Sequence, residues 1–217
     1  MNIYTIYSPS HAHWFKIFKT SLSNCKDCTL YSRTAPQVCK SGNYGSSDAI
    51  NFYYLKVLHI LEILHTETEP FVYADVDVYF FRDFVDDLES RLKDNDMVIQ
   101  YEKKVFGFKT GCNGFAYMRP NKKMKDAYAW VLKNLHRFKG DQQALNAYIY
   151  THRIKMDYLP KTYYSINYDN GDTVWDGEDV DITVKDPFLA HVHWAVGNKL
   201  KLLEMIKEKI CSGLGKL

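Results

Sequence analysis

Two aspartates interrupt an otherwise apolar run at residues 71–80, FVYADVDVYF. A strand buried on both faces is nearly all apolar, so Asp75 and Asp77 need a reason to be there. Residues two apart point to the same side of an extended chain, and open α/β sheets bind ligands at the carboxyl ends of their strands. Two neighbouring buried carboxylates repel each other and lose hydration, a cost that a divalent cation removes. Because carboxylate oxygens suit magnesium and manganese, the pair predicts a Mg2+ or Mn2+ site.

The expected metal indicates a substrate that carries phosphate. A divalent ion held by only one or two carboxylates usually shares its coordination with substrate phosphates. The chain has neither the G-x-x-x-x-G-K-[ST] pattern of P-loop enzymes nor the G-x-G-x-x-G pattern of dinucleotide-binding folds. The sequence therefore gives no support to either class. The alternative that needs no metal is a strand end at which one aspartate caps a turn.

The elements that must position these residues alternate between strands and helices. The pattern predicts strands at residues 2–7, 28–33, 71–80, 97–101, 114–118 and 188–194, and helices at 11–22, 48–65, 83–92, 122–136, 141–150 and 200–211. Residues 158–187 are polar and are expected to be irregular. The alternation favours one α/β domain over residues 1–217 with a largely parallel sheet, whether or not a longer protein continues beyond it. The helix at 48–65 is expected to begin at a serine N-cap, either Ser46 or Ser47. Its apolar side is expected to bury a row of leucines, namely Leu55, Leu58, Leu61 and Leu64.

The composition argues against several classes of protein. The net charge of +2 and the sequence pI near 8.1 are too balanced to indicate binding to nucleic acid or to an anionic membrane. The five cysteines are an odd number, and Cys25 and Cys28 lack a second pair, so we expect free thiols rather than disulfides or zinc. No apolar run is long enough to span a membrane and the N-terminus is not a signal peptide, so we expect a cytoplasmic protein.

Four further stretches accompany the D-x-D pattern in a fixed order along the chain. NFYYLKVLHIL places Lys56 on the helix before it. GCNGFAYMRP follows with Asn113 and Gly114, GDQQALN carries Asp141 and Gln142, and HVHWAVGNKLK comes last. As a set, over about residues 2–201, they resemble the retaining GT-A glycosyltransferases, nucleotide-diphospho-sugar transferases that include bacterial galactosyltransferases and glycogenins.

The resemblance implies a single Rossmann-like GT-A domain whose mostly parallel central sheet is flanked by helices. It implies metal-dependent transfer of a hexose or deoxyhexose from a UDP-sugar to a hydroxyl of a glycan or glycoprotein, with retention of configuration. Similar small enzymes occur in large DNA viruses, where the location would be the host cytoplasm. The implied metal ligands are Asp75, Asp77 and His193, with His191 as the competing candidate. The implied donor contacts are Tyr7, Ser8, Ser10, Lys56, Val76, Cys112, Asn113, Gly114, Asp141, Gly197 and Lys199.

Catalysis would fall to Gln142 and Asp141. Asp141 would accept hydrogen bonds from sugar hydroxyls, and the Gln142 amide would lie near the anomeric carbon, where an amide is too weak for a covalent nucleophile. A polar segment, DNGDTVWDGEDVD, is expected to be a lid with Trp175 as a platform for the acceptor sugar. Should the transfer invert configuration, the base would come from this segment, from Asp172, Asp176 or Glu178.

Other interpretations remain open for the same residues. Haloacid-dehalogenase-like phosphatases also use a D-x-D pair, here Asp75 and Asp77, and GDTVWD at residues 171–176 matches their later acidic motif. A sugar-binding module without catalysis is a third class. Lys56 alone fits a surface helix lysine whose stem lies on apolar neighbours, and Asp141 alone fits a helix N-cap. Either histidine near the C-terminus could be hydrogen-bonded rather than bound to metal.

Overall fold

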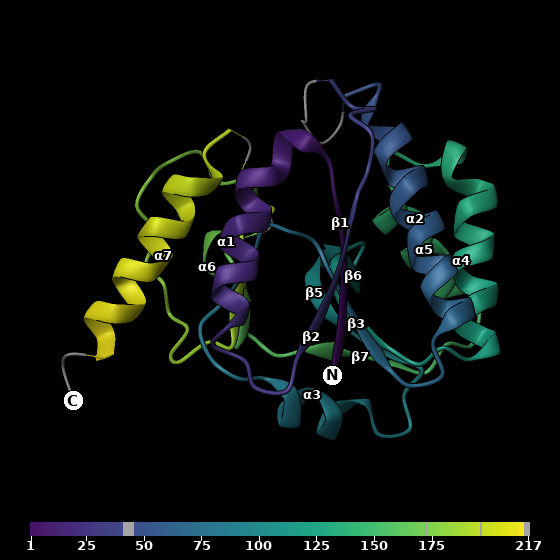
Figure 1. The fold of residues 1–217 in the computed structure, drawn as a ribbon. Helices are drawn as coiled ribbons and strands as arrows, with labels where there is room; N and C mark the ends of the chain where they lie inside the picture. Colours follow the sequence, from purple (N-terminus) through teal and green to yellow (C-terminus); the bar gives the residue numbers. More distant parts are fainter. Residues whose placement is uncertain (41–45, 172, 196, 215–217) are drawn as a thin grey trace.

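The main sheet of the protein has six strands. The structure is a computed structural model that describes residues 1–40, 46–171, 173–195 and 197–214. The strand order of the main sheet is β2-β1-β3-β6-β5-β7 (Figure 1). Only β6 runs against its two neighbours, β3 and β5, and the other pairs are parallel. The prediction of an α/β domain with a mostly parallel sheet is confirmed. The strands are β1 (Asn2–Tyr7), β2 (Thr29–Thr34), β3 (Phe71–Ala74), β5 (Met97–Val105), β6 (Phe108–Met118) and β7 (Met156–Leu159).

A second, three-stranded sheet continues from the end of β3. The chain turns at Asp75–Asp77 into β4 (Val78–Phe80), which pairs antiparallel with β9 (Leu189–His191). β9 also pairs in parallel with β8 (Tyr163–Ser165). In the register of β4 and β9, Val78 lies opposite His191. This pairing brings residues more than a hundred positions apart to the carboxyl end of β3.

Helices cover both faces of the main sheet (Figure 1). One apolar cluster joins α2, α4 and α5 to one face, and another joins α1 and α3 to the opposite face. A third cluster packs α7 against the second sheet. The helices are α1 (Ala12–Leu22), α2 (Ala49–Thr66), α3 (Val85–Leu92), α4 (Lys122–Asn134), α5 (Asp141–Thr151), α6 (Asn167–Asn170) and α7 (Lys199–Leu214), with short 3-10 turns η1 (Pro9–His11) and η2 (Leu135–Arg137).

Four local predictions are wrong. The N-cap of α2 is Asp48 rather than a serine, and Leu58 is 41% exposed while Val57 and Ile60 are fully buried. Leucines spaced by three rotate steadily around a 3.6-residue helix, so a row of them cannot stay on one face. The segment expected to be irregular contains β8 and α6. The last strand ends at His191, which leaves His193 beyond it.

Two absences were also expected. None of the five cysteines forms a disulfide in the structure. Among the described residues, none of the helices has the length and apolar character needed to cross a membrane.

Candidate active site

The two aspartates meet where β3 ends. Asp75 is held by its backbone N–H, which donates to the carbonyl of Gly114 on β6 at 2.8 Å. Asp77 is buried, and the Nε2 atom of His191 lies 3.2 Å from its Oδ1. One oxygen of each carboxylate and one nitrogen of His191 lie within 4.8 Å of one another. The structure therefore brings the two predicted aspartates together, with His191 as a third potential metal ligand.

Gly114 is required by the closeness of these groups. A Cβ atom at this position would lie 2.3 Å from His191 Cε1 and 2.8 Å from Asp75 Oδ2. Both distances are much shorter than van der Waals contact, so a residue larger than glycine would displace the side chain of His191 or Asp75. Gly114, which the sequence placed at the sugar, is part of the floor beneath the carboxylates.

Each aspartate has a lysine partner. Lys56 Nζ lies 2.9 Å from Asp75 Oδ2 and 3.2 Å from Asp141 Oδ2, and Lys199 Nζ lies 2.5 Å from Asp77 Oδ2. Burial alone would lower the pKa of Lys56, but Asp141 and Asp75 hold that pKa well above its usual value. Burial alone would raise the pKa of Asp77, but the charge and the hydrogen bond of Lys199 hold it well below its usual value. Lys56 is thus a buried ion-pair residue, and the surface-lysine interpretation is wrong.

Asp141 connects this cluster to the helices on one face of the sheet. It is the first residue of α5, after an N-cap at Gly140, so the interpretation of Asp141 as an N-cap is wrong. Its Oδ2 accepts a hydrogen bond from Asn113 Nδ2 at 2.6 Å. Asn113 in turn accepts one from the hydroxyl of Tyr128 at 2.6 Å. The result is a continuous polar chain from α4 through β6 and α5 to Lys56.

The hydrogen bonds of His191 determine which of its nitrogens carries the proton. Gln100 Nε2 donates to two backbone carbonyls, of Tyr163 and Tyr164, so its Oε1 faces His191 Nδ1 at 2.7 Å. Nδ1 must therefore be the donor, and burial lowers the pKa of His191, which favours the neutral ring. The unprotonated Nε2 then faces a carboxylate oxygen of Asp77. Two acceptors at 3.2 Å need a proton or a metal ion between them, and with Asp75 nearby these residues fit a metal ion.

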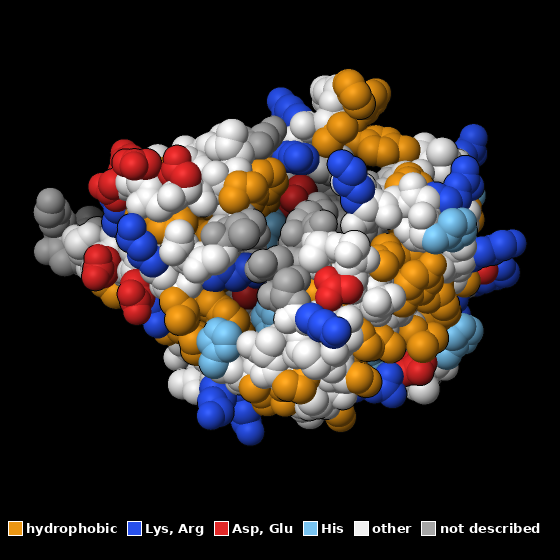
Figure 2. Space-filling model, turned by 90° about the horizontal axis from the view of Figure 1, so that it is seen from above, with side chains coloured by type: hydrophobic (Ala, Val, Ile, Leu, Met, Phe, Trp, Pro, Cys, Tyr) orange, Lys and Arg blue, Asp and Glu red, His pale blue; other side chains and the backbone are white. Residues whose placement is uncertain are grey.

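Seen from the edge where the strands end, this region is hollowed (Figure 2). Acidic and histidine side chains are visible at the bottom of the hollow, between the side chains that surround it. A site of this shape, with buried carboxylates, two lysines and a neutral imidazole, can bind an anionic ligand together with a cation.

Comparison with known proteins agrees with this geometry. A family model described as nucleotide-diphospho-sugar transferase matches residues 17–205. The chain belongs to the nucleotide-diphospho-sugar transferase family. It is therefore a glycosyltransferase, and neither the phosphatase interpretation nor a binding module without catalysis is supported. A comparison with curated proteins gave no match.

Solved glycosyltransferases share the fold of this nucleotide-diphospho-sugar transferase. The galactosyltransferase LgtC, solved with donor and acceptor sugar analogs, has a TM-score of 0.58 and 14% identity over 96% of both chains. GlyE of Streptococcus pneumoniae has a TM-score of 0.62 and 15% identity over 91% of this chain, which spans 55% of GlyE. A glycosyltransferase involved in the glycosylation of the major capsid of PBCV-1 has a TM-score of 0.62 and 12% identity, over 94% and 98% of the two chains.

Within this transferase site, His193 occupies a different position from the one predicted. Its Nε2 lies 2.8 Å from Glu102 Oε2, and its ring centroid lies 4.0 Å from that of His191. With Cys112 and His191 it forms a second group of potential metal ligands, which shares His191 with the group of the aspartates. The structure therefore places His191, the competing candidate, beside Asp77, while His193 faces Glu102.

Glu102 is a buried site residue that the sequence did not reveal. Burial alone would raise its pKa, but the charge of His193, helped by hydrogen bonding that includes Gln142, holds the pKa at about 2. Along β5, Tyr101 pairs with Gly111 and Lys103 with Thr110, so Glu102 between them has no partner on β6. Gln100, two residues earlier, is also buried, so Glu102 continues an inward-facing row. A charged residue in a strand normally faces solvent, and no local pattern in the sequence marks Glu102 as an exception.

The remaining predicted residues lie around this centre. Ser8 and Ser10 follow β1 and hydrogen-bond to each other and to His11, whose pKa is lowered first by burial and then by the charge of Lys199. Tyr7 stacks on Phe15 at 4.3 Å between ring centroids. Val76 is buried in the turn between the aspartates, and Gly197, with a φ of 78°, precedes α7.

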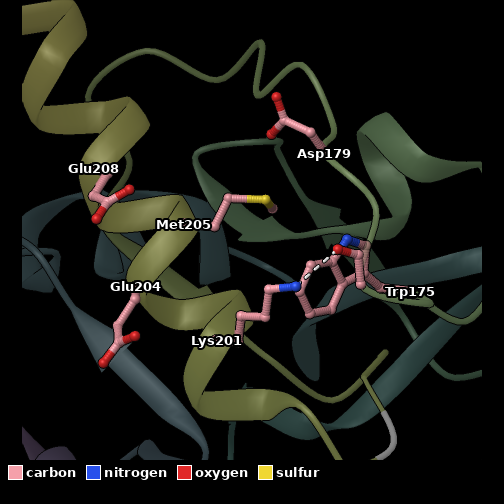
Figure 3. Close-up of a pocket in the computed structure, with 7 residues that line it drawn as sticks. Trp175, Asp179, Lys201, Glu204, Met205 and Glu208 are labelled. Carbon is pink, nitrogen blue, oxygen red and sulfur yellow. Dashed lines mark hydrogen bonds between the residues drawn. The ribbon is translucent and has the colours of Figure 1, made fainter.

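Trp175 is not an exposed platform in this structure. It is 2% exposed, and its Nε1 donates to the carbonyl of Glu178 at 2.7 Å. Together with residues of α7 it lines a pocket of about 360 Å3, next to Lys201 and Glu204 (Figure 3). Asp176 bonds within the same segment, its Oδ1 accepting from Glu178 N, and Asp172 lies outside the described residues.

Proposed function

We propose that the chain transfers a hexose or deoxyhexose from a UDP-sugar to a hydroxyl group of a glycan or glycoprotein, with Mn2+ or Mg2+ as cofactor. The observation that carries the metal is the contact between the Nε2 acceptor of His191 and the Asp77 carboxylate. We assign the ligands as Asp75, Asp77 and His191, in place of the predicted His193. When bound, the ion would offset the negative charge that builds on the leaving diphosphate.

The chain's own residues then divide the remaining work. The ammonium of Lys199 would face the diphosphate, because it lies at the mouth of the cluster and is 30% exposed. Lys56 is buried and would keep the carboxylates of Asp75 and Asp141 fixed. Asp141, positioned by Asn113, would accept hydrogen bonds from hydroxyls of the donor sugar.

We propose retention of configuration, because Gln142 offers an amide rather than a carboxylate to the reacting carbon. Its proximity to Glu102 orients that amide. Transfer with inversion is the alternative, and one observation favours it. The pair of Glu102 and His193 is a buried carboxylate beside an imidazole, the combination from which a base for the acceptor hydroxyl could come.

The test is a panel of nucleotide sugars with manganese, followed by nucleoside-diphosphate release and by proton NMR of the first glycoside formed. We expect release from UDP-hexoses and a product with the donor's anomeric configuration. Asp77→Asn should nearly abolish release, while Asp126→Asn, an exposed aspartate on α4, should leave it unchanged. Full turnover by Asp77→Asn would refute the metal assignment. An inverted anomeric coupling would refute retention and favour Glu102 and His193.

A further inference from the structure

The hairpin of β5 and β6 carries bare hydrophobic side chains at its tip. Phe106 is 97% exposed, Phe108 is 61% exposed and Val105 is 38% exposed. Isolated exposed apolar residues are common on proteins, but contiguous groups of them mark interaction sites. These three residues lie in a two-residue turn and next to it, so they form a contiguous group. Residues 105–108 are called the hairpin tip below.

The turn itself does not favour phenylalanine. Val105 and Phe108 pair across the hairpin, and the two residues between them have φ angles of 49° at Phe106 and 83° at Gly107. Asparagine, aspartate or glycine is the usual first residue in such a turn, and a bulky side chain with positive φ is an outlier. A strained residue whose side chain contacts solvent indicates that a partner selects it.

Lysines surround the tip. The segment KKVFGFK at residues 103–109 contains three lysines and no acidic residue, although the whole chain is nearly balanced in charge. Lys104 lies directly opposite Lys109 across the hairpin. Both side chains are exposed, so their charges are accessible to an anionic surface. Composition alone therefore misses a local basic and apolar patch.

The hairpin is firmly held and points outward on the side of the active site. The hydroxyls of Tyr150 and Tyr158 both donate to the carbonyl of Lys109, at 2.6 and 2.7 Å. β5 runs in the same direction as β3, and Glu102 marks the level of the active site, so the tip extends beyond it at the same edge. Hydrophobic side chains project at the rim of this face, with lysine or arginine side chains beside them (Figure 2).

We propose that the hairpin tip inserts into the interfacial region of an anionic lipid bilayer, with Lys104 and Lys109 at the headgroups. A convex tip of phenylalanines has no side-chain hydroxyl or amide with which to select the hydroxyls of a sugar. Apolar side chains between lysines instead match the layering of a bilayer surface, where hydrocarbon lies beneath anionic headgroups. The active site would then open toward the membrane, whatever the donor and acceptor are.

The test is co-sedimentation of the full chain with vesicles of phosphatidylcholine alone or with phosphatidylserine. We expect binding to the vesicles that contain phosphatidylserine, weakened by salt. Phe106→Ser with Phe108→Ser should weaken binding at least about tenfold. Lys104→Glu with Lys109→Glu should weaken it by about twenty-fivefold or more, at roughly fivefold per lysine.

Matched controls separate the tip from general surface effects. Leu58→Ser removes an exposed leucine from α2, and Lys93→Glu with Lys122→Glu makes the same charge change at the opposite edge of the sheet. Both should bind like the wild type, and all variants should keep its melting temperature. Absence of wild-type binding, or equal binding by tip and control variants, would overturn the proposal. So would a dimer that depends on Phe106 and Phe108 without vesicle binding, because the partner would then be a second copy.

Discussion

Replacing Lys56 by methionine should expose how strongly the site depends on buried charge compensation. Lys56 Nζ contacts Asp75 and Asp141 at 2.9 and 3.2 Å, and its side chain is only 6% exposed. Methionine fills a similar volume but leaves the two carboxylates without their shared cation. Removing one partner of a buried ion pair typically costs about 3–5 kcal/mol. A domain of this size has a total stability of about 5–15 kcal/mol, so Lys56→Met should fold but unfold at clearly lower urea concentration.

The assay is urea unfolding of a double-mutant cycle made of Lys56→Met, Asp141→Asn and the double variant. In Lys56→Met, the carboxylate of Asp141 should destabilise the fold only because it has lost its cationic partner. The free energy of unfolding of the double variant should then be about 2 kcal/mol higher than the sum of the two single changes predicts. Lys122→Met removes the exposed lysine of a pair with Asp126 and should cost less than about 1 kcal/mol. Additive effects of Lys56→Met and Asp141→Asn would refute the shared-cation reasoning, as would a cost of Lys56→Met no greater than that of Lys122→Met.

Three further outcomes follow from the site. UDP-sugars should raise the melting temperature much more with manganese than with EDTA, and equal shifts would exclude the proposed metal. Gly114→Ala should weaken donor binding, measured by the same thermal shift, because its Cβ would displace His191 or Asp75; unchanged binding would contradict the close packing. The pKa of Glu102 falls from its ordinary 4.5 to about 2 in the folded protein. Its ionisation therefore contributes about 3 kcal/mol to the free energy of unfolding above pH 4.5, and this contribution is lost as pH falls toward 2. The deficit of Glu102→Gln in urea unfolding should therefore shrink in acid, and a deficit independent of pH would contradict that pKa.

The predicted residues that the structure brings together follow local patterns in the sequence. Asp75 and Asp77 were recognisable because they break an apolar run at the end of a strand, and that position follows from the period of the chain alone. Lys56 and Asp141 were expected at the site, but their direct ion pair was not. That contact joins α2 to α5, and it depends on how two helices pack on one face of the sheet.

The parts that were missed depend on tertiary detail. His191 and His193 share a strand-like spacing, so the pattern could not decide between them. The decision comes from the end of β9 at His191 and from its pairing with β4 beside Asp77. Glu102 is buried beside His193, and Trp175 packs in the cluster around α7. Each of these misses concerns a contact between segments far apart in the sequence, which a local pattern does not encode.

The charges gathered at the site make a cation a requirement of the proposed reaction rather than an addition to it. Among the described side chains beside the D-x-D turn, Asp75, Asp77 and Asp141 are carboxylates, and Lys56 and Lys199 are their cationic partners. One negative charge is therefore in excess before any donor arrives. A diphosphate would bring further negative charge to a buried, low-dielectric site, where repulsion between like charges is poorly screened. A divalent ion between Asp77 and the neutral His191 reverses that balance, so the ion should bind before the donor or together with it.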